Sequence, residues 1–110
     1  MPYNADLAER LSKLMAGRSE LEPRKMFGGI CFMLNGNVCL GVYKDFLILR
    51  VGPRNSAKLL RKLFAKPMDI TGKPMKGWIM VSRAGWSDEK ELKQMSQLAL
   101  SFVETLPPKD

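Results

Sequence analysis

The chain has 110 residues, and its 18 Lys and Arg against 11 Asp and Glu give a formal net charge of +7. This length suits one hydrophobic core, so we expect a single domain over 1–110. Histidine is absent, which excludes Ser-His-Asp and Cys-His nucleophiles and the usual zinc ligand. No apolar stretch approaches the roughly 20 residues of a membrane span, and the N-terminus lacks a signal-peptide pattern. We therefore expect a cytoplasmic protein without a cofactor, a metal ion or a membrane contact.

The first predicted element is an amphipathic helix over 4–16. Asn4 suits the N-cap position, and Gly17 suits a left-handed stop. The apolar residues recur at helical spacing, as Leu7, Leu11, Leu14 and Met15.

A three-stranded antiparallel meander is predicted over 25–51, because turn residues at 35–36 and 44–45 separate apolar runs. We take the turn at 44–45 as a two-residue loop, which pairs Tyr43 with Phe46. One face of the meander is then wholly apolar and belongs to the core: Val38, Leu40, Val42, Leu47, Leu49 and Val51.

The turn at 35–36 allows two registers. A two-residue loop would place Asn37 and Gly41 on the same face as Phe32. A three-residue loop pairs Leu34 with Val38 and Phe32 with Leu40, and it keeps the apolar set together. We prefer the three-residue loop, because a slip of one residue would turn that set away from the core.

The opposite face of the meander is also unusually apolar. It carries Cys31, Met33, Cys39, Tyr43, Phe46, Ile48 and Arg50, whereas the solvent face of an antiparallel sheet is normally polar. The first and last predicted helices have single apolar stripes and would be used on the first face, and the short middle helix cannot cover three strands. We therefore predict a homodimer whose candidate contact residues are Met33, Tyr43, Phe46 and Ile48. In either register the two cysteines lie too far apart, or on opposite faces, for a disulfide.

In the second half of the chain, the apolar pattern predicts a short helix over 55–65, strands over 68–70 and 78–82, and a final helix. Ser87 suits the N-cap of that final helix. Its apolar stripe contains Leu92, Met95, Ala99, Phe102, Val103 and Leu106. The order α-β-β-β-α-β-β-α predicts an α+β fold, with an antiparallel sheet packed against helices in two layers.

Seven of the 18 Lys and Arg lie between Arg54 and Lys76, and Asp69 is the one acid among them. The usual meaning of such a run is a solvated face; the functional alternative is contact with an acidic partner or with phosphate. The candidate contact residues are Arg54, Lys58, Arg61, Lys62, Lys73 and Lys76. The string Thr71-Gly72-Lys73 is not a phosphate loop, since Pro67 and Pro74 stand where that motif needs Gly and Ser or Thr.

Five strings in this order resemble the TfoX (Sxy) N-terminal domain family: Lys25-Met26-Phe27-Gly28-Gly29, Leu34-Asn35-Gly36-Asn37, Gly41-Val42-Tyr43, Leu49-Arg50-Val51-Gly52-Pro53 and Gly72-Lys73-Pro74-Met75-Lys76-Gly77-Trp78. The resemblance implies a small fold related to secretion-chaperone-like domains and a role in bacterial gene regulation. The founding members are accessory activators of DNA-uptake competence and carry a second, C-terminal domain. We expect a stand-alone N-terminal domain here.

Together these observations predict a non-enzymatic regulatory or adaptor module that acts through protein–protein contacts. Its partner would be an acidic protein, or a component of the transcription machinery. The alternative is direct, largely sequence-independent binding of nucleic acid through segment 54–76. No helix-turn-helix, zinc-finger or RNA-binding signature supports that alternative.

Overall fold

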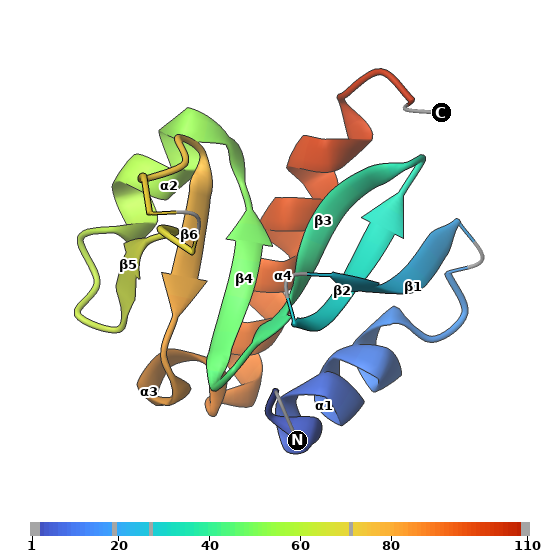
Figure 1. The fold of residues 1–110 in the computed structure, drawn as a ribbon, viewed down its shortest axis with the longest axis horizontal. Helices are drawn as coiled ribbons and strands as arrows, with labels where there is room; N and C mark the ends of the chain where they lie inside the picture. Colours follow the sequence, from blue (N-terminus) through green and yellow to red (C-terminus); the bar gives the residue numbers. More distant parts are fainter. Residues whose placement is uncertain (1–2, 19, 27, 71, 109–110) are drawn as a thin grey trace.

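The protein folds as one six-stranded antiparallel sheet with helices against it, in a computed structural model that describes residues 3–18, 20–26, 28–70 and 72–108 (Figure 1). The strands lie in the order β1-β2-β3-β4-β6-β5. The elements are α1 (Ala5–Met15), β1 (Leu21–Met26), β2 (Gly29–Leu34), β3 (Asn37–Tyr43), β4 (Phe46–Arg50), α2 (Gly52–Leu59), β5 (Ala65–Pro67), β6 (Trp78–Val81), α3 (Arg83–Trp86) and α4 (Glu89–Glu104). The α+β class predicted from the sequence is confirmed.

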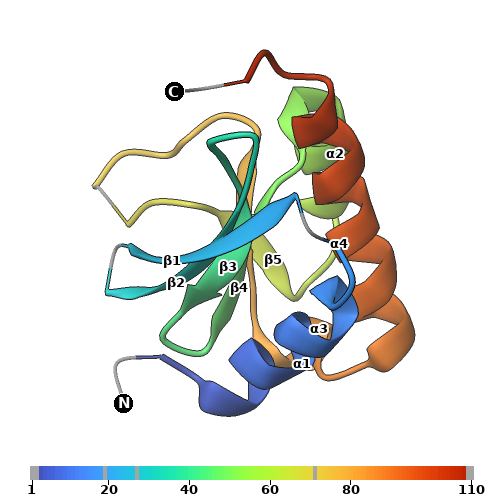
Figure 2. The ribbon, with the colours of Figure 1, turned by 90° about the vertical axis from the view of Figure 1, so that its right-hand side faces the viewer.

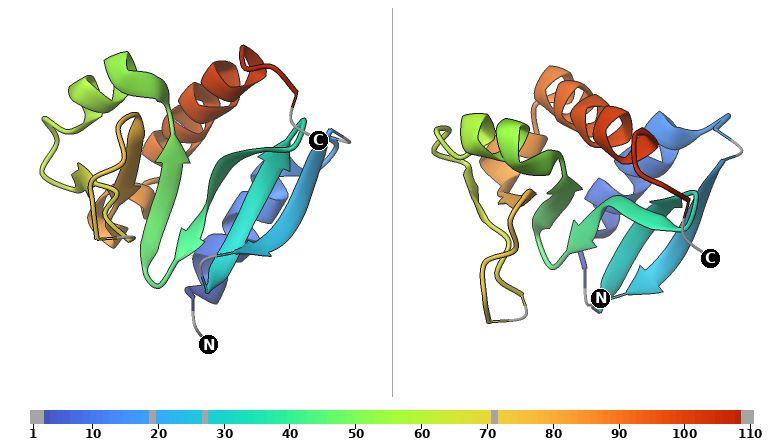
Figure 3. Two further views of the ribbon diagram at one scale, coloured as in Figure 1. Left: turned by 45° about the horizontal axis from the view of Figure 1, so that its top comes forward. Right: turned by 90° about the horizontal axis from the view of Figure 1, so that it is seen from above.

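The four helices pack against the same face of the sheet (Figures 2 and 3). Helix α4 is the longest and contacts β2, β3 and β4, while α1 contacts β3 and α2 contacts β6. The predicted cap of α1 is confirmed, because the Asn4 side chain accepts a hydrogen bond from the Leu7 N–H. The predicted apolar stripes of α1 and α4 account for this placement, since each helix buries one face on the sheet.

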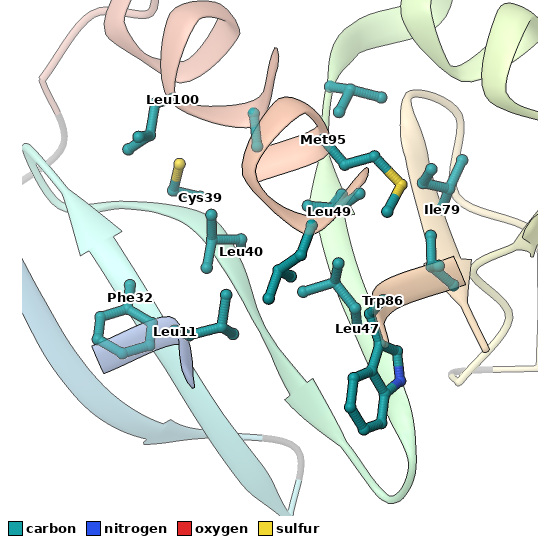
Figure 4. Close-up of a cluster of buried hydrophobic side chains, with 14 of the residues drawn as sticks. Leu11, Phe32, Cys39, Leu40, Leu47, Leu49, Ile79, Trp86, Met95 and Leu100 are labelled. Atoms are coloured by element: carbon teal, nitrogen blue, oxygen red, sulfur yellow. The ribbon is translucent and has the colours of Figure 1, made fainter. Parts of the chain in front are cut away.

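The main core lies between the sheet and these helices. Its buried side chains include Leu11 of α1, Leu40 and Leu49 of the sheet, and Met95 of α4 (Figure 4). Trp86 closes one end of this core with 1% of its surface exposed, and its indole N–H donates to the Asp45 carbonyl at 2.8 Å. The hydrogen bond satisfies the indole N–H, which would otherwise be buried without a partner.

The β2–β3 hairpin combines the two registers that the sequence allowed. Its tip is a two-residue turn, with Leu34 opposite Asn37 and positive φ at Asn35 (53°) and Gly36 (82°), as a type I′ turn requires. The register then shifts between Phe32 and Met33, so that Phe32 pairs with Leu40. The predicted pairing of Phe32 is therefore correct, and the predicted pairing of Leu34 with Val38 is wrong.

The register shift is a bulge at Cys39 that places this residue beside Leu40 in the main core (Figure 4). The assignment of Cys39 to the opposite face is therefore wrong. Cys31 precedes Phe32 along β2, so by strand alternation it points away from the core in which Phe32 lies. The two thiols belong to opposite faces of the sheet, and both are free, as predicted.

The opposite face of the sheet is partly covered by the same chain. After β5 the chain folds over this face, and Met68, Ile70 and Met75 join a second cluster with Ile48 and Met80. A hydrogen bond from the Met75 N–H to the Met68 carbonyl, 2.9 Å, holds this cover together. The sequence argument attributed any cover to a helix or a second subunit; an irregular segment supplies it.

Five elements differ from the sequence-based prediction. Strand β1 was not predicted as a separate strand, because the first strand of the meander was expected to begin at 25; β1 carries Pro23 and charged residues at an edge, which hid its pattern. Helix α2 ends at Leu59, and the strand expected over 68–70 lies at Ala65–Pro67. Helix α3 was not predicted, and it displaces the start of α4, whose N-cap is Asp88 and not Ser87.

Candidate interaction surface

The densest part of the basic run lies on helix α2 and in the turns that follow it, and the start of α2 is held by the residue before β6. Gly52 begins the helix with φ 87°, a left-handed conformation that glycine adopts without strain. The N–H groups of Val51 and Gly52 both donate to the Gly77 carbonyl, at 2.9 and 3.0 Å. Pro53 follows at the first helical turn, where its missing N–H removes no helical bond.

A groove of about 280 Å³ separates α2 from α4. Its walls combine apolar side chains with two predicted contact residues, Lys58 and Lys62. The lining residues are Asn55, Lys58, Leu59, Lys62, Glu91, Gln94, Met95 and Leu98. Lys62 lies 3.9 Å from Glu91 and 5.7 Å from the Phe64 ring, while Lys58 is exposed on the α2 wall.

Two large apolar side chains are exposed at the end of α2. Leu60 has 38% of its surface exposed, and Leu63 is fully exposed. The predicted helix over 55–65 is wrong at its C-terminal end, and both side chains lie beyond the end of the helix. The helix stops at Leu59 and the chain continues in turns, so the helical spacing no longer directs these side chains inward. Leu63 thus stands in water beside Arg61 and Lys62, which are also exposed.

The remaining cations of the run are exposed but do not gather at the groove. Arg54 lies on the first turn of α2, and Lys73 lies on the loop before β6. The Lys66 ammonium lies 4.6 Å from the Phe46 ring centre, and Phe46 packs against the second cluster. The basic run is therefore divided between the helix side of the molecule and the opposite face of the sheet.

Lys76 borders a second groove, of about 260 Å³, on the other side of α2. Leu60, Met75 and Trp78 contribute most of its apolar side chains, together with Pro67 and Pro74. The Trp78 ring is also covered by the Arg50 guanidinium, 5.3 Å from the ring centre. Leu60 lines this second groove, while Lys58 and Lys62 line the first. Helix α2 and the residues that follow it therefore have a groove on each side.

The candidate dimer residues do not form an open patch. Met33 and Ile48 are 6% and 3% exposed within the single chain, and only Tyr43 and Phe46 are half-buried. The apolar area that motivated the dimer is therefore smaller than the sequence suggested, which corrects the premise of that prediction. Self-association itself stays a prediction.

The thiols are poor nucleophiles in the folded protein. Burial raises the pKa of Cys31 to about 11. Burial likewise raises the pKa of Cys39 to about 12, against the opposing effect of the Arg50 and Arg18 charges. Because the thiolate is the reactive form, neither group is suited to catalysis.

The apolar lining of the first groove was only partly visible in the sequence. Leu98 lies outside the stripe that we assigned to the last helix, and together with Gln94 and Met95 it turns one flank of α4 toward α2. A leucine beside the main stripe was the available signal. Phe27 and Thr71, which belong to two of the motifs quoted above, lie outside the described residues.

No group of three or more Cys, Asp or Glu suited to a metal ion occurs among the described residues. Across the same residues, none of the helices is both long and apolar enough to cross a membrane.

Comparison with known proteins identifies the family. A family model described as the TfoX N-terminal domain matches residues 13–103. No match was found among curated proteins or among solved structures. The family match extends from the second half of α1 to near the end of α4, so it includes every strand and both walls of the groove. The chain therefore belongs to the TfoX N-terminal domain family, a regulatory-type family that is not known to be enzymatic.

Proposed function

We propose that this protein is a non-enzymatic regulatory or adaptor module that binds an acidic partner protein through the α2 surface. We define the α2 surface as Lys58, Arg61, Lys62 and Leu63 together with the groove between α2 and α4. The observation that carries the proposal is the fully exposed Leu63 beside exposed cations. Membership of a regulatory-type family supports the general role.

The mixture of apolar and basic groups favours a protein partner. Protein interfaces place apolar side chains at their centre and charged groups at their rim. Here the groove is lined by Leu59, Met95 and Leu98 together with Lys58 and Lys62. A matching partner would present apolar side chains flanked by Asp or Glu, and its acidic groups would speed association and set its orientation.

Nucleic-acid binding through segment 54–76 is less well supported. Sequence-independent binding of single strands combines a continuous basic track with aromatic rings on which bases stack. Lys66 belongs to the opposite face of the sheet from the groove, so the track is interrupted. Trp86 is buried and the Trp78 ring is covered by Arg50, which leaves few rings for stacking.

The groove also lacks the features of an active site. Its one carboxylate, Glu91, lies beside Lys62, and the sequence has no histidine to act as a base. The two buried thiols are unpaired, and this supports the further proposal that the protein acts in the reducing cytoplasm.

The test is a capture experiment with charge-reversed variants, with and without nuclease. The test variant is Lys58→Glu, Arg61→Glu and Lys62→Glu; the matched control reverses three exposed cations elsewhere, Arg24, Lys25 and Lys44. We expect both variants to fold, because exposed charges contribute little to stability. Wild type and control should retain a nuclease-resistant acidic partner that the test variant loses, and titration with the purified partner should repeat this order.

Leu63→Ser separates the two classes of partner. Removing an exposed apolar contact should weaken a protein partner, whereas binding to phosphates would not change. Equal retention of the purified partner by wild type and the charge-reversed variant would refute the proposed surface. A salt-dependent gel shift of random duplex DNA that Leu63→Ser leaves unchanged would favour the nucleic-acid alternative.

A further inference from the structure

A further pocket lies between α4, the end of α1 and the loop that follows α1, away from the α2 surface. Ser96 of α4 is 2% exposed, and among the described residues its hydroxyl is the one buried side-chain polar atom without a hydrogen-bond partner. Serines inside helices often bond to the carbonyl four residues earlier, but Ser96 does not. A buried hydroxyl without a partner costs stability, so a water molecule or a ligand that reaches it would stabilise the folded protein.

The Ser96 residue lines a pocket that also contains two cations. The lining residues are Leu14, Met15, Arg18, Lys93, Ser96, Gln97 and Leu100. Lys93, Ser96, Gln97 and Leu100 follow the spacing of one helix face, and Arg18 comes from the loop after α1. None of the residues that line this pocket is acidic, so its electrostatic potential favours an anion.

We propose that this pocket binds a tetrahedral oxyanion, such as phosphate, through Arg18, Lys93 and the Ser96 hydroxyl. Charged donors bind oxyanions through short, strong hydrogen bonds, and the hydroxyl supplies one more donor. The volume of about 60 Å³ exceeds the roughly 10–15 Å³ that one water molecule requires. There is room for a small anion, and the apolar wall formed by Leu14, Met15 and Leu100 limits its size.

The experiment compares the stability of the intact protein in phosphate and in chloride at equal ionic strength. At a phosphate concentration ten times its dissociation constant, the ratio of folded to unfolded protein should rise about 11-fold over chloride. Ser96→Ala should weaken phosphate binding roughly 10-fold or more, since it removes a hydrogen bond to a charged group. In chloride the same variant should be as stable as wild type or more stable, because it removes a buried group without a partner.

Lys93→Gln and Lys90→Gln form a matched pair on α4. Both remove one exposed positive charge from the same helix, but only Lys93 lines the pocket. We expect the phosphate response to fall in Lys93→Gln and to persist in Lys90→Gln. Equal responses to phosphate and chloride in wild type, or an unchanged phosphate response in Ser96→Ala, would overturn the proposal.

The source of the oxyanion is distinguished by a second ligand. Inorganic phosphate and O-phosphoserine share the group that the pocket recognises, but only the latter needs an opening for its organic part. Stabilisation of the protein by both ligands supports a site open to phosphomonoesters, and stabilisation by phosphate alone supports a site for the free ion. We expect Ser96→Ala to lose stabilisation by both ligands and to retain partner binding at the α2 surface. This pattern tests the pocket independently of the proposed function.

Discussion

At the scale of single residues, the strongest constraints are backbone conformations and buried polar or thiol groups. At Gly52 two effects disfavour a larger residue: the left-handed backbone conformation and the close approach of a neighbouring side chain. The Gly52 φ of 87° is unfavourable for other residues, and a Cβ added there would lie 2.6 Å from the Phe102 ring. Gly72 shares the backbone conformation, with φ 90°, but faces open space. The two positions therefore separate backbone strain from steric overlap.

We predict that Gly72→Ala lowers the free energy of unfolding by about 1–2 kcal/mol, the cost of a left-handed conformation. Gly52→Ala should lose roughly 1–3 kcal/mol more, the usual cost of overpacking. Urea unfolding of both variants measures the difference. Equal losses would mean that the Phe102 ring moves aside without cost.

The buried thiols predict a dependence of stability on alkaline pH. The pKa values of Cys31 and Cys39 are raised to about 11 and about 12 in the folded protein, from 9.0. Between pH 9 and pH 11 the unfolded chain has lost protons that the folded protein keeps, so stability falls as pH rises. The slope is at most about 1.4 kcal/mol per pH unit for each thiol.

Urea unfolding across pH 9 to 11 measures this slope, and a double Cys31→Ala, Cys39→Ala variant is the control for lysine and tyrosine titration. The wild type should lose more stability than the double variant over this range. Parallel curves for the two proteins would show that the thiols do not contribute.

At the scale of elements, the position of a helix end decides which side chains are available to a partner. Helix α2 stops at Leu59, so Leu59 packs in the core while Leu63, one turn later in the sequence, is fully exposed. At the start of α4 the two candidate caps are adjacent. The Asp88 side chain accepts a hydrogen bond from the Glu91 N–H at 3.0 Å, and Ser87 instead follows the short helix α3.

We predict that Asp88→Ala lowers the free energy of unfolding by about 1 kcal/mol, the usual value for a lost N-cap. Ser87→Ala should change it by no more than about 0.5 kcal/mol, because Ser87 is exposed and its side chain makes no capping bond. Thermal unfolding of the two variants tests the assignment. The reverse order would restore Ser87 as the cap.

At the scale of the whole molecule, the sheet is protected against open-ended association. Strand β1 at one edge carries Pro23 with Glu22, Arg24 and Lys25, and β5 at the other edge has three residues and ends in Pro67. Proline, charge and short length are the usual means of blocking strand addition at an edge. A partner or a second copy would therefore bind to a face of the molecule and not to an edge of the sheet.

The predicted homodimer would be centred on Tyr43 and Phe46, the half-buried members of the candidate dimer face. We expect Tyr43→Glu to sediment as a folded monomer and Tyr43→Phe, which keeps the ring, to sediment as the wild-type dimer. A wild-type monomer at high micromolar concentration would refute self-association through this face.

The sequence by itself determined the α+β class and the start of α1, because hydrophobic periodicity, turn residues and caps act locally. The family followed from the resemblance of five motifs and from the family-model match. It also indicated correctly that Cys31 and Cys39 do not pair. The bulge at Cys39 required the tertiary structure, since an extra residue in a strand leaves no mark on composition and only packing decides which face it joins. The cover over Ile48 likewise depends on contacts between distant segments. For the same reason, the α2–α4 groove and the Arg18–Ser96 pocket exist only after folding, because their walls come from elements separated along the chain.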